Sequence, residues 1–217
     1  MPSAVDICNL GLAHLGSDAQ VASIDPPDGS AEAGHCARFW PIVRAEMLSS
    51  GAWSFARTRA MLTPVTNVST AWAYAYALPS NLLNTLRVLK SFVLLDYGYS
   101  PSYGYVSRDE VALFNERGSA NFDVEGSVLF TNEPNAVLLY IHDVIDLSRY
   151  GSTCVAALGY LMASYLAGPL IKGTEGAQAG SRFRQAAMAL MKEAMAQDAS
   201  NSFEPANDIP ASIRARA

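Results

Sequence analysis

The sequence predicts an α+β fold, in which N- and C-terminal helices form one bundle and a mostly antiparallel β-sheet domain is inserted between them. Apolar residues recur at helical spacing near both ends of the chain, whereas the middle alternates as strands do. Connections between the strand-like segments are short, which favours antiparallel pairing. We therefore divide the 217 residues into N-terminal helices (1–60), a sheet domain (61–150), C-terminal helices (151–198) and an extended arm (199–217).

Two helices are predicted in the N-terminal segment. The first covers about residues 3–15, where Gly16 follows as a stop signal. The second begins near Ser30, a favourable N-cap residue, and Gly51 ends it. Pro41 lies inside the second pattern and should kink or restart that helix.

The middle of the chain is predicted to form one sheet of four to six strands. Residues 72–78 and 86–95 have strand-like patterns, and residues 136–144 alternate in the same way. Residues 121–132 resemble a hairpin, because two alternating segments flank the turn signal Glu125-Gly126.

Two helices are predicted after the sheet, over residues 153–171 and 175–198, with Gly173 between them. Residues 150–171 contain no charge over 22 positions, which is long enough to cross a bilayer. Glycine, serine, threonine and proline interrupt this segment, and its flanks show no positive-inside bias. We therefore expect a buried helix and no membrane span.

The charge distribution argues against specific DNA binding. The formal net charge is −5, no run of Lys or Arg occurs, and residues 61–150 hold five basic and nine acidic residues. A nucleic-acid reader usually carries a basic patch. The three cysteines, Cys8, Cys36 and Cys154, are scattered among apolar neighbours and are interpreted as buried free thiols in a reducing compartment.

No cofactor or metal site is predicted. The histidines, His14, His35 and His142, have no partner at metal-ligand spacing and are interpreted as packed or capping residues. The segment Gly173-Thr174-Glu175-Gly176 lacks the Gly-Lys-Ser/Thr ending of a phosphate-binding loop, so it is interpreted as a helix boundary.

One enzyme hypothesis remains from the residues alone. A small hydrolase acting on glycosidic bonds needs two carboxylates, and Asp109 with Glu110, or Asp143 with Asp146, could supply them. The competing interpretation is that these are solvated loop acids.

Two segments are candidates for contacts with other subunits. Four tyrosines lie among small residues in 96–105, a composition suited to protein contact, to packing within the domain or to stacking on single-stranded DNA. The arm carries apolar residues without a regular period and is predicted to order by docking on a neighbour. The predicted interface residues are Tyr97, Tyr99, Tyr103, Tyr105, Phe203, Ile209 and Ile213.

Several motifs resemble a known family. Residues 39–48, Phe-Trp-Pro-Ile-Val-Arg-Ala-Glu-Met-Leu, precede Trp53-Ser54-Phe55-Ala56. This resembles the tail tubular protein A adaptors of podoviruses, in which an aromatic-x-x-x-Arg-x-x-x-Leu helix leads into Trp-Asn-Phe-Ala. Residues 7–16 are similar to the family's first helix, and Tyr76-Ala77-Leu78-Pro79 to a strand ending in Leu-Pro. Ser54 stands where the family usually has Asn.

The resemblance implies a structural virion protein rather than an enzyme. Such adaptors form a ring of about twelve copies, located in the tail between the portal and the tail nozzle. Genomic DNA passes through the channel without specific binding, and assembly takes place in the host cytoplasm. Arg44, Trp53 and Phe55 would then be residues that tie the bundle to the sheet. A monomeric chaperone or connector that never enters the particle is a further alternative.

Overall fold

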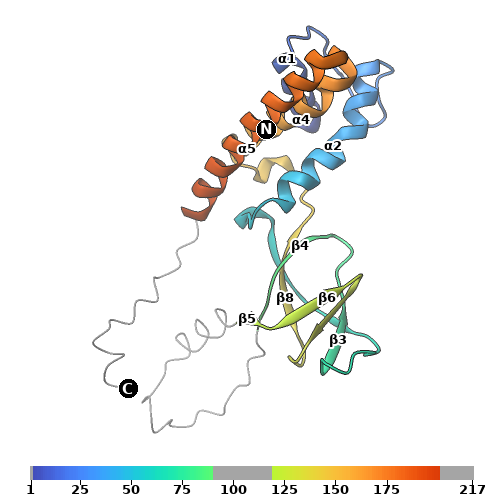
Figure 1. Cartoon of the computed structure of the whole chain (residues 1–217), viewed down its shortest axis with the longest axis vertical. Coiled ribbons are helices and arrows are strands. Elements are labelled where there is room, and N and C mark those ends of the chain that lie inside the picture. Colours follow the sequence, from blue (N-terminus) through green and yellow to red (C-terminus); the bar gives the residue numbers. More distant parts are fainter. Residues whose placement is uncertain (1, 90–118, 201–217) are drawn as a thin grey trace, which may run out of the picture.

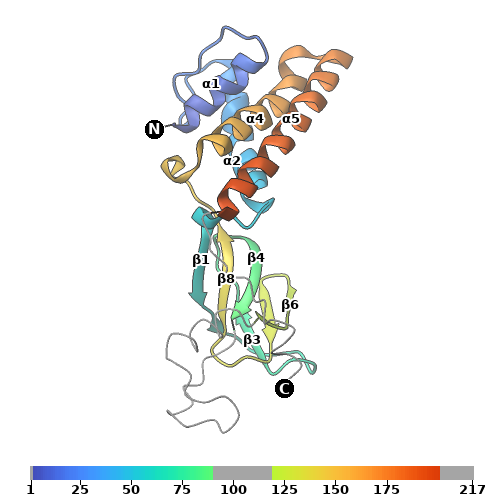
Figure 2. The same cartoon turned by 90° about the vertical axis from the view of Figure 1, so that its left-hand side faces the viewer.

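The structure is a computed structural model, and it describes residues 2–89 and 119–200 of the chain. Within these residues four α-helices and two four-stranded antiparallel sheets form an elongated molecule, with the helices at one end and the sheets at the other (Figures 1 and 2). This arrangement confirms the predicted α+β fold class.

The helical end combines the two terminal segments of the chain. Helices α4 and α5 lie side by side, and α1 and α2 pack against α4 (Figure 2). The bounds are α1 (Ala4–His14), α2 (Ala31–Ser49), α4 (Ser152–Ile171) and α5 (Gly173–Ser200). Each predicted helix is therefore present within a few residues of its expected limits.

The helix ends follow the capping signals of the sequence. Ser3 accepts a hydrogen bond from the Asp6 amide at 3.1 Å, and the Asp6 carboxylate accepts one from the Ser3 amide at 2.8 Å, which completes a capping box. The Ser30 hydroxyl accepts from the Ala33 amide at 3.1 Å and caps α2. Helix α2 does not restart at Pro41 but continues through it to Ser49.

Helix α4 occupies the centre of the bundle. Its buried residues include Leu158, Met162 and Leu166, none of which is exposed to solvent. By length and composition this helix could also cross a membrane, and half of its apolar window is buried inside the protein. Packing against three other helices accounts for the uncharged segment without a bilayer.

The strands form two sheets rather than the single predicted sheet. The first has the order β1 (Arg57–Met61), β8 (Val137–His142), β4 (Leu82–Leu89) and β5 (Ser119–Ala120). The second has the order β2 (Thr63–Pro64), β3 (Tyr74–Ala77), β7 (Val128–Thr131) and β6 (Phe122–Glu125). They pack through one shared core, which contains Val88, Leu138 and Tyr140 from the first sheet and Tyr76 and Leu129 from the second.

The predicted hairpin is present as β6 and β7, with Gly126 at a positive φ of 59° in its turn. Strand β4 begins at Leu82, four residues before the predicted start. The sequence does not reveal this earlier part, because two register irregularities interrupt its alternation. Leu83 and Leu86 consequently pack against the core of the bundle. The predicted strand residues 90–95 lie outside the described part of the chain.

Strand β1 was not predicted, and all of it except Met61 lies in the segment assigned to helices. The bundle core extends toward the first sheet, because Ile141 of β8 belongs to the same buried cluster as Trp53 and Leu158. The two ends of the molecule are thus joined by packed side chains as well as by the backbone.

Candidate functional site

The chain passes between the bundle and the sheets twice, and hydrogen bonds, an ion pair and aromatic contacts connect these two passages to each other and to the helices. We call residues 50–56 and 142–151 the joint. Three of the residues singled out by the family resemblance, Arg44, Trp53 and Phe55, are located in or beside it.

An ion pair connects α2 to the second passage. Arg44 donates from Nε to Oδ1 of Asp143 at 2.8 Å and from Nη2 to Oδ2 at 2.7 Å. The two side chains are only 13% and 32% exposed, so water screens the pair less than it screens a surface pair. The Arg44 guanidinium also lies 5.9 Å from the centre of the Trp40 ring.

Aromatic rings fill the interior of the joint. Trp53 is 1% exposed, and its indole nitrogen donates to the carbonyl oxygen of Met47 at 2.9 Å. The Phe55 ring lies 5.8 Å from that of Trp53 and 4.7 Å from that of Tyr150. The prediction that Trp53 and Phe55 join the bundle to the sheet is therefore confirmed.

Hydrogen bonds hold the two passages to each other. Arg149 donates to the carbonyl oxygen of Phe55 at 2.6 Å, and Nδ1 of His142 lies 2.8 Å from the carbonyl oxygen of Ala56. These bonds therefore hold the two connections between bundle and sheets side by side. Burial also raises the pKa of Tyr150, whose hydroxyl donates to the Val144 carbonyl at 2.8 Å.

The last turns of α5 reach the same place. The Ser54 amide donates to one oxygen of Asp198 at 2.6 Å, and the Ser54 hydroxyl donates to the other at 2.5 Å. Ser54 thus anchors the end of α5 at the joint.

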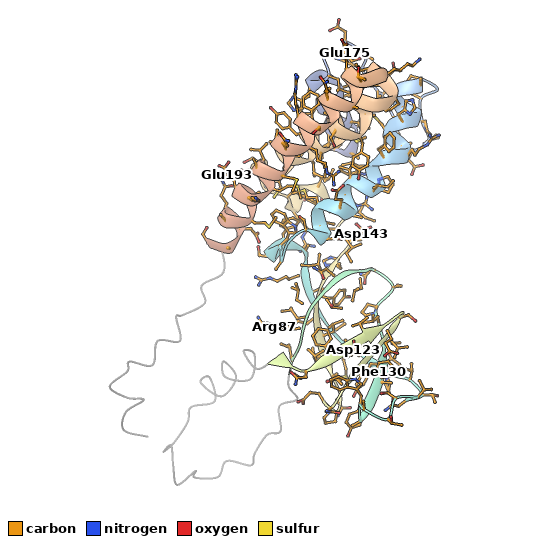
Figure 3. All side chains as sticks on the ribbon, viewed as in Figure 1. Arg87, Asp123, Phe130, Asp143, Glu175 and Glu193 are labelled. Carbon is orange, nitrogen blue, oxygen red and sulfur yellow. The ribbon has the colours of Figure 1, made fainter. Side chains whose placement is uncertain are left out.

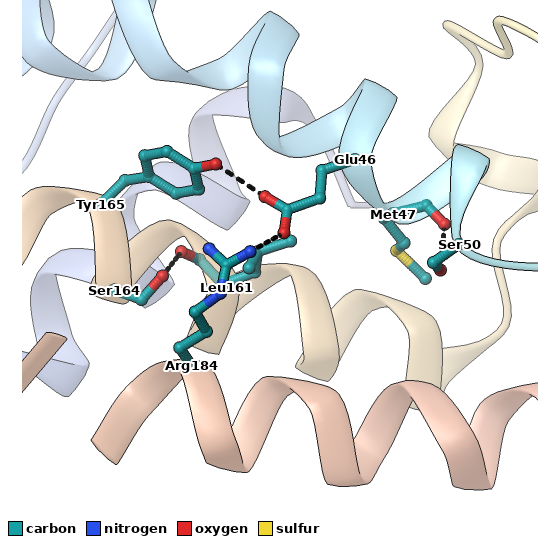
Figure 4. Close-up of polar contacts among 7 residues, drawn as sticks. All are labelled: Glu46, Met47, Ser50, Leu161, Ser164, Tyr165 and Arg184. Carbon is teal, nitrogen blue, oxygen red and sulfur yellow. Dashed lines mark hydrogen bonds and ion pairs between the residues drawn. The ribbon is translucent and has the colours of Figure 1, made fainter. Parts of the chain in front are cut away.

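A shallow groove lies between α2, α4 and α5 (Figure 4). Glu46 accepts a hydrogen bond from the Tyr165 hydroxyl at 2.7 Å and forms an ion pair with Arg184. Donation to the Glu46 carboxylate raises the pKa of Tyr165. The groove has a volume of about 580 Å³, but its polar groups bond to one another, so they tie three helices together.

The acidic residues of the hydrolase hypothesis have local structural partners where they are described. Asp143 pairs with Arg44, and Asp146 accepts from the Ser148 amide at 3.0 Å at the start of a short 3-10 turn. Hydrogen bonding to Ser148 lowers the pKa of Asp146. Asp109 and Glu110 lie outside the described residues.

The histidines pack as expected. The His14 ring stacks on Tyr160 at a centroid distance of 4.0 Å, and the His35 ring stacks on Phe39 at 6.3 Å. Within residues 2–89 and 119–200, no group of three His, Cys, Asp or Glu side chains is placed to hold a metal ion.

The three cysteines are free and buried, which confirms that part of the prediction. Burial raises the pKa of the Cys154 thiol to about 11. A hydrogen bond to the Cys36 thiol, together with burial, raises the pKa of the Cys8 thiol.

All seven predicted interface residues, Tyr97, Tyr99, Tyr103, Tyr105, Phe203, Ile209 and Ile213, lie outside the described part of the chain. The structure instead brings together three arginines that do not form a run of basic residues in the sequence. Arg57, Arg59 and Arg87 surround Leu139 on the first sheet and line a hollow of about 450 Å³. The alternating Arg57-Thr58-Arg59 sequence was the available signal, since residues two apart on a strand share a face.

No protein-family model matches the sequence, and no curated protein matches it.

Proposed function

We propose that this chain is the adaptor subunit of a short-tailed bacteriophage, which forms a ring between the portal and the tail nozzle. Its role is structural, and the ring contains about twelve copies. The observation that carries the proposal is the joint, because Arg44, Trp53 and Phe55, which belong to the motif behind the family resemblance, make several of its contacts.

Trp40, Arg44, Trp53 and Phe55 illustrate this correspondence. Trp40 is 6% exposed and stacks beneath Arg44, while Arg44 reaches across to Asp143. Trp53 and Phe55 fill the space between the two passages. These side chains attach the helical bundle to the sheets in a fixed arrangement. A ring adaptor needs such an attachment, since its helical and sheet parts must keep one angle in every copy.

The proposed channel is consistent with the charges of the sheet domain. Residues 61–150 carry nine acidic and five basic residues, which disfavours retention of a polyanion. We therefore propose that genomic DNA passes without specific binding. The tyrosine segment 96–105 and the arm 199–217 are proposed as further contacts with neighbouring subunits, the portal or the nozzle.

Assembly provides the test. The purified protein should form rings, or wait as a monomer and bind when the portal protein of the same phage is added. Light scattering and negative-stain electron microscopy, with and without portal, measure both behaviours. A protein that neither self-associates nor binds portal would contradict the proposal. Detection of the chain in purified virions separates an adaptor from a chaperone that never enters the particle.

A further inference from the structure

We propose that the sheet domain forms a front-to-back contact between neighbouring copies of this chain. The outer face of the first sheet, with Arg57, Arg59 and Arg87, would bind the outer face of β6 in the next copy, with Asp123 and Glu125. This inference rests on the proposed function, because it specifies one contact of the ring.

The three arginines lie on one face of the first sheet. Arg59 of β1 and Arg87 of β4 pair with Leu139 of β8 from opposite sides, so the three residues form one row across the sheet. Arg57 lies two residues away on β1 and therefore shares that face. We call this surface the arginine face.

The arginine face points away from the second sheet. Val88 and Leu138 are neighbours in sequence of Arg87 and Leu139, and both belong to the core between the sheets. Because side chains alternate along a strand, Arg87 and Leu139 project from the opposite side. Leu139 is 6% exposed and provides an apolar floor beneath the charged groups.

Two of the three guanidinium groups on the arginine face, those of Arg57 and Arg87, retain unused hydrogen-bonding capacity. The side chains of Arg57 and Arg87 form no hydrogen bond or ion pair with any residue of the described chain. Each guanidinium carries five N–H donors in a planar arrangement that matches a carboxylate. The fitting partner is therefore a surface that presents carboxylates at matching separations.

The chain carries such a surface on the other side of the sheet domain. Val124 of β6 pairs with Leu129 of β7, and Leu129 is buried in the core between the sheets. Asp123 and Glu125, which alternate with Val124, therefore project outward, and both are exposed. Figure 3 shows Arg87 at the left of the two sheets and Asp123 to its right.

The two surfaces match in spacing as well as in sign. Asp123 and Glu125 are two residues apart on an edge strand, and so are Arg57 and Arg59 on another. Both separations are roughly 7 Å in extended backbone. A basic front and an acidic back on one domain favour a heterologous contact, which repeats from copy to copy and closes into a ring when the rotation permits.

Charge reversal tests the contact. The first variant combines Arg57→Glu with Arg87→Glu and is acidic on both faces. The second combines Asp123→Lys with Glu125→Lys and is basic on both faces. Each variant alone should need about tenfold or more protein to assemble than the parent, because like charges then face each other. Association of the parent should also weaken as salt is raised.

Mixing the two variants is the decisive measurement. In a one-to-one mixture the reversed arginine face of the first variant, now acidic, meets the reversed outer face of β6 in the second variant, now basic. Assembly should therefore recover, with the two variants alternating around the ring. Native mass spectrometry of variants with distinct masses counts each species in the ring. The reversals Arg182→Glu with Lys192→Glu, and Glu175→Lys with Glu193→Lys, are matched controls on α5; Figure 3 labels Glu175 and Glu193 on the bundle. The control variants should assemble as the parent does, and thermal melting should show all variants folded.

The possible results separate this inference from the proposed function. Assembly of either sheet variant alone at the parent's concentration, or failure of the mixture, would overturn the contact while the adaptor role stands. Loss of binding to a DNA duplex in the arginine variant, with assembly unchanged, would overturn it in favour of a phosphate-binding surface. A parent protein that associates neither with itself nor with portal would contradict both proposals.

Discussion

Arg44 donates hydrogen bonds to both carboxylate oxygens of Asp143 and so connects helix α2 to the residue that follows strand β8. The pair is 99 residues apart in sequence. It therefore fixes a long-range relationship between the bundle and the sheets, which no local propensity of either segment could supply.

Removal of one partner of this ion pair should destabilise the fold. We expect Asp143→Ala to lower the free energy of unfolding by about 2–3 kcal/mol, because a partly buried guanidinium loses two charge-assisted hydrogen bonds. Urea denaturation of Arg44→Ala, Asp143→Ala and the double variant gives their coupling. The exposed Asp18→Ala should change stability by less than about 0.5 kcal/mol. A coupling energy near zero would show that the pair contributes nothing.

Trp53 should be among the most sensitive positions of the joint. Trp53→Ala is expected to cost about 3–5 kcal/mol, since the change leaves a cavity where the ring is 1% exposed. Trp53→Phe retains a ring but loses the bond to Met47, so a smaller loss of about 1–2 kcal/mol is expected. Thermal melting measures both, with Val68→Ala, at an 82% exposed position, as the control. An unchanged midpoint for Trp53→Ala would mean that the ring does not support the core.

Two glycines in helices should respond oppositely to alanine. A Cβ at Gly176 of α5 would lie 2.9 Å from the Ala167 carbonyl oxygen of α4, so Gly176→Ala should separate the helices and cost about 1–2 kcal/mol. Gly34 of α2 has nothing within 4 Å of that position, so Gly34→Ala should stabilise by about 0.5–1 kcal/mol through helix propensity. Equal effects in chemical denaturation would argue against close packing of α4 and α5.

Alkaline pH should weaken the fold through Cys154. Burial raises the pKa of this thiol from 9.0 to about 11, so the unfolded chain loses the proton first. Stability is then complete below about pH 9 and falls as the pH rises toward 11, by as much as about 2–3 kcal/mol.

The Cys154→Ala variant should show a shallower fall in unfolding free energy over this pH range than the parent. Tyr150→Phe is the necessary companion, because burial also raises the pKa of Tyr150. If the parent and Cys154→Ala have the same slope against pH, the thiol is not the titrating group.

The elements with strong local signals were predictable from the sequence. Ser3 and Ser30 mark helix starts through capping, and Glu125-Gly126 marks a hairpin turn, so each follows from bonds within a few residues. The first strand was missed because Arg57, Thr58 and Arg59 show no apolar alternation, and the apolar residues Ala60 and Met61 come only at its end. The bulges of β4 place Leu83 and Leu86 toward the bundle, which removes the alternation that identifies a strand.

The joint was predictable in part. The resemblance singled out Arg44, Trp53 and Phe55, but Asp143 was interpreted as a solvated loop acid or a possible catalytic acid. The pairing with Arg44 depends on where β8 ends relative to α2, which is a property of the packed fold. The arginine face has the same origin, since β1 and β4 contribute arginines to one row only through their shared neighbour β8.

The bond between the two passages has a consequence for how the molecule could be remodelled. Nδ1 of His142 lies 2.8 Å from the carbonyl oxygen of Ala56, although 86 residues separate the two in sequence. The two connections between the sheets and the helical bundle therefore lie next to each other. The sheet segment between these connections can be lengthened or exchanged for another while the helical bundle keeps its own connections. The sheet end of the molecule is therefore suited to the insertion of other sequences.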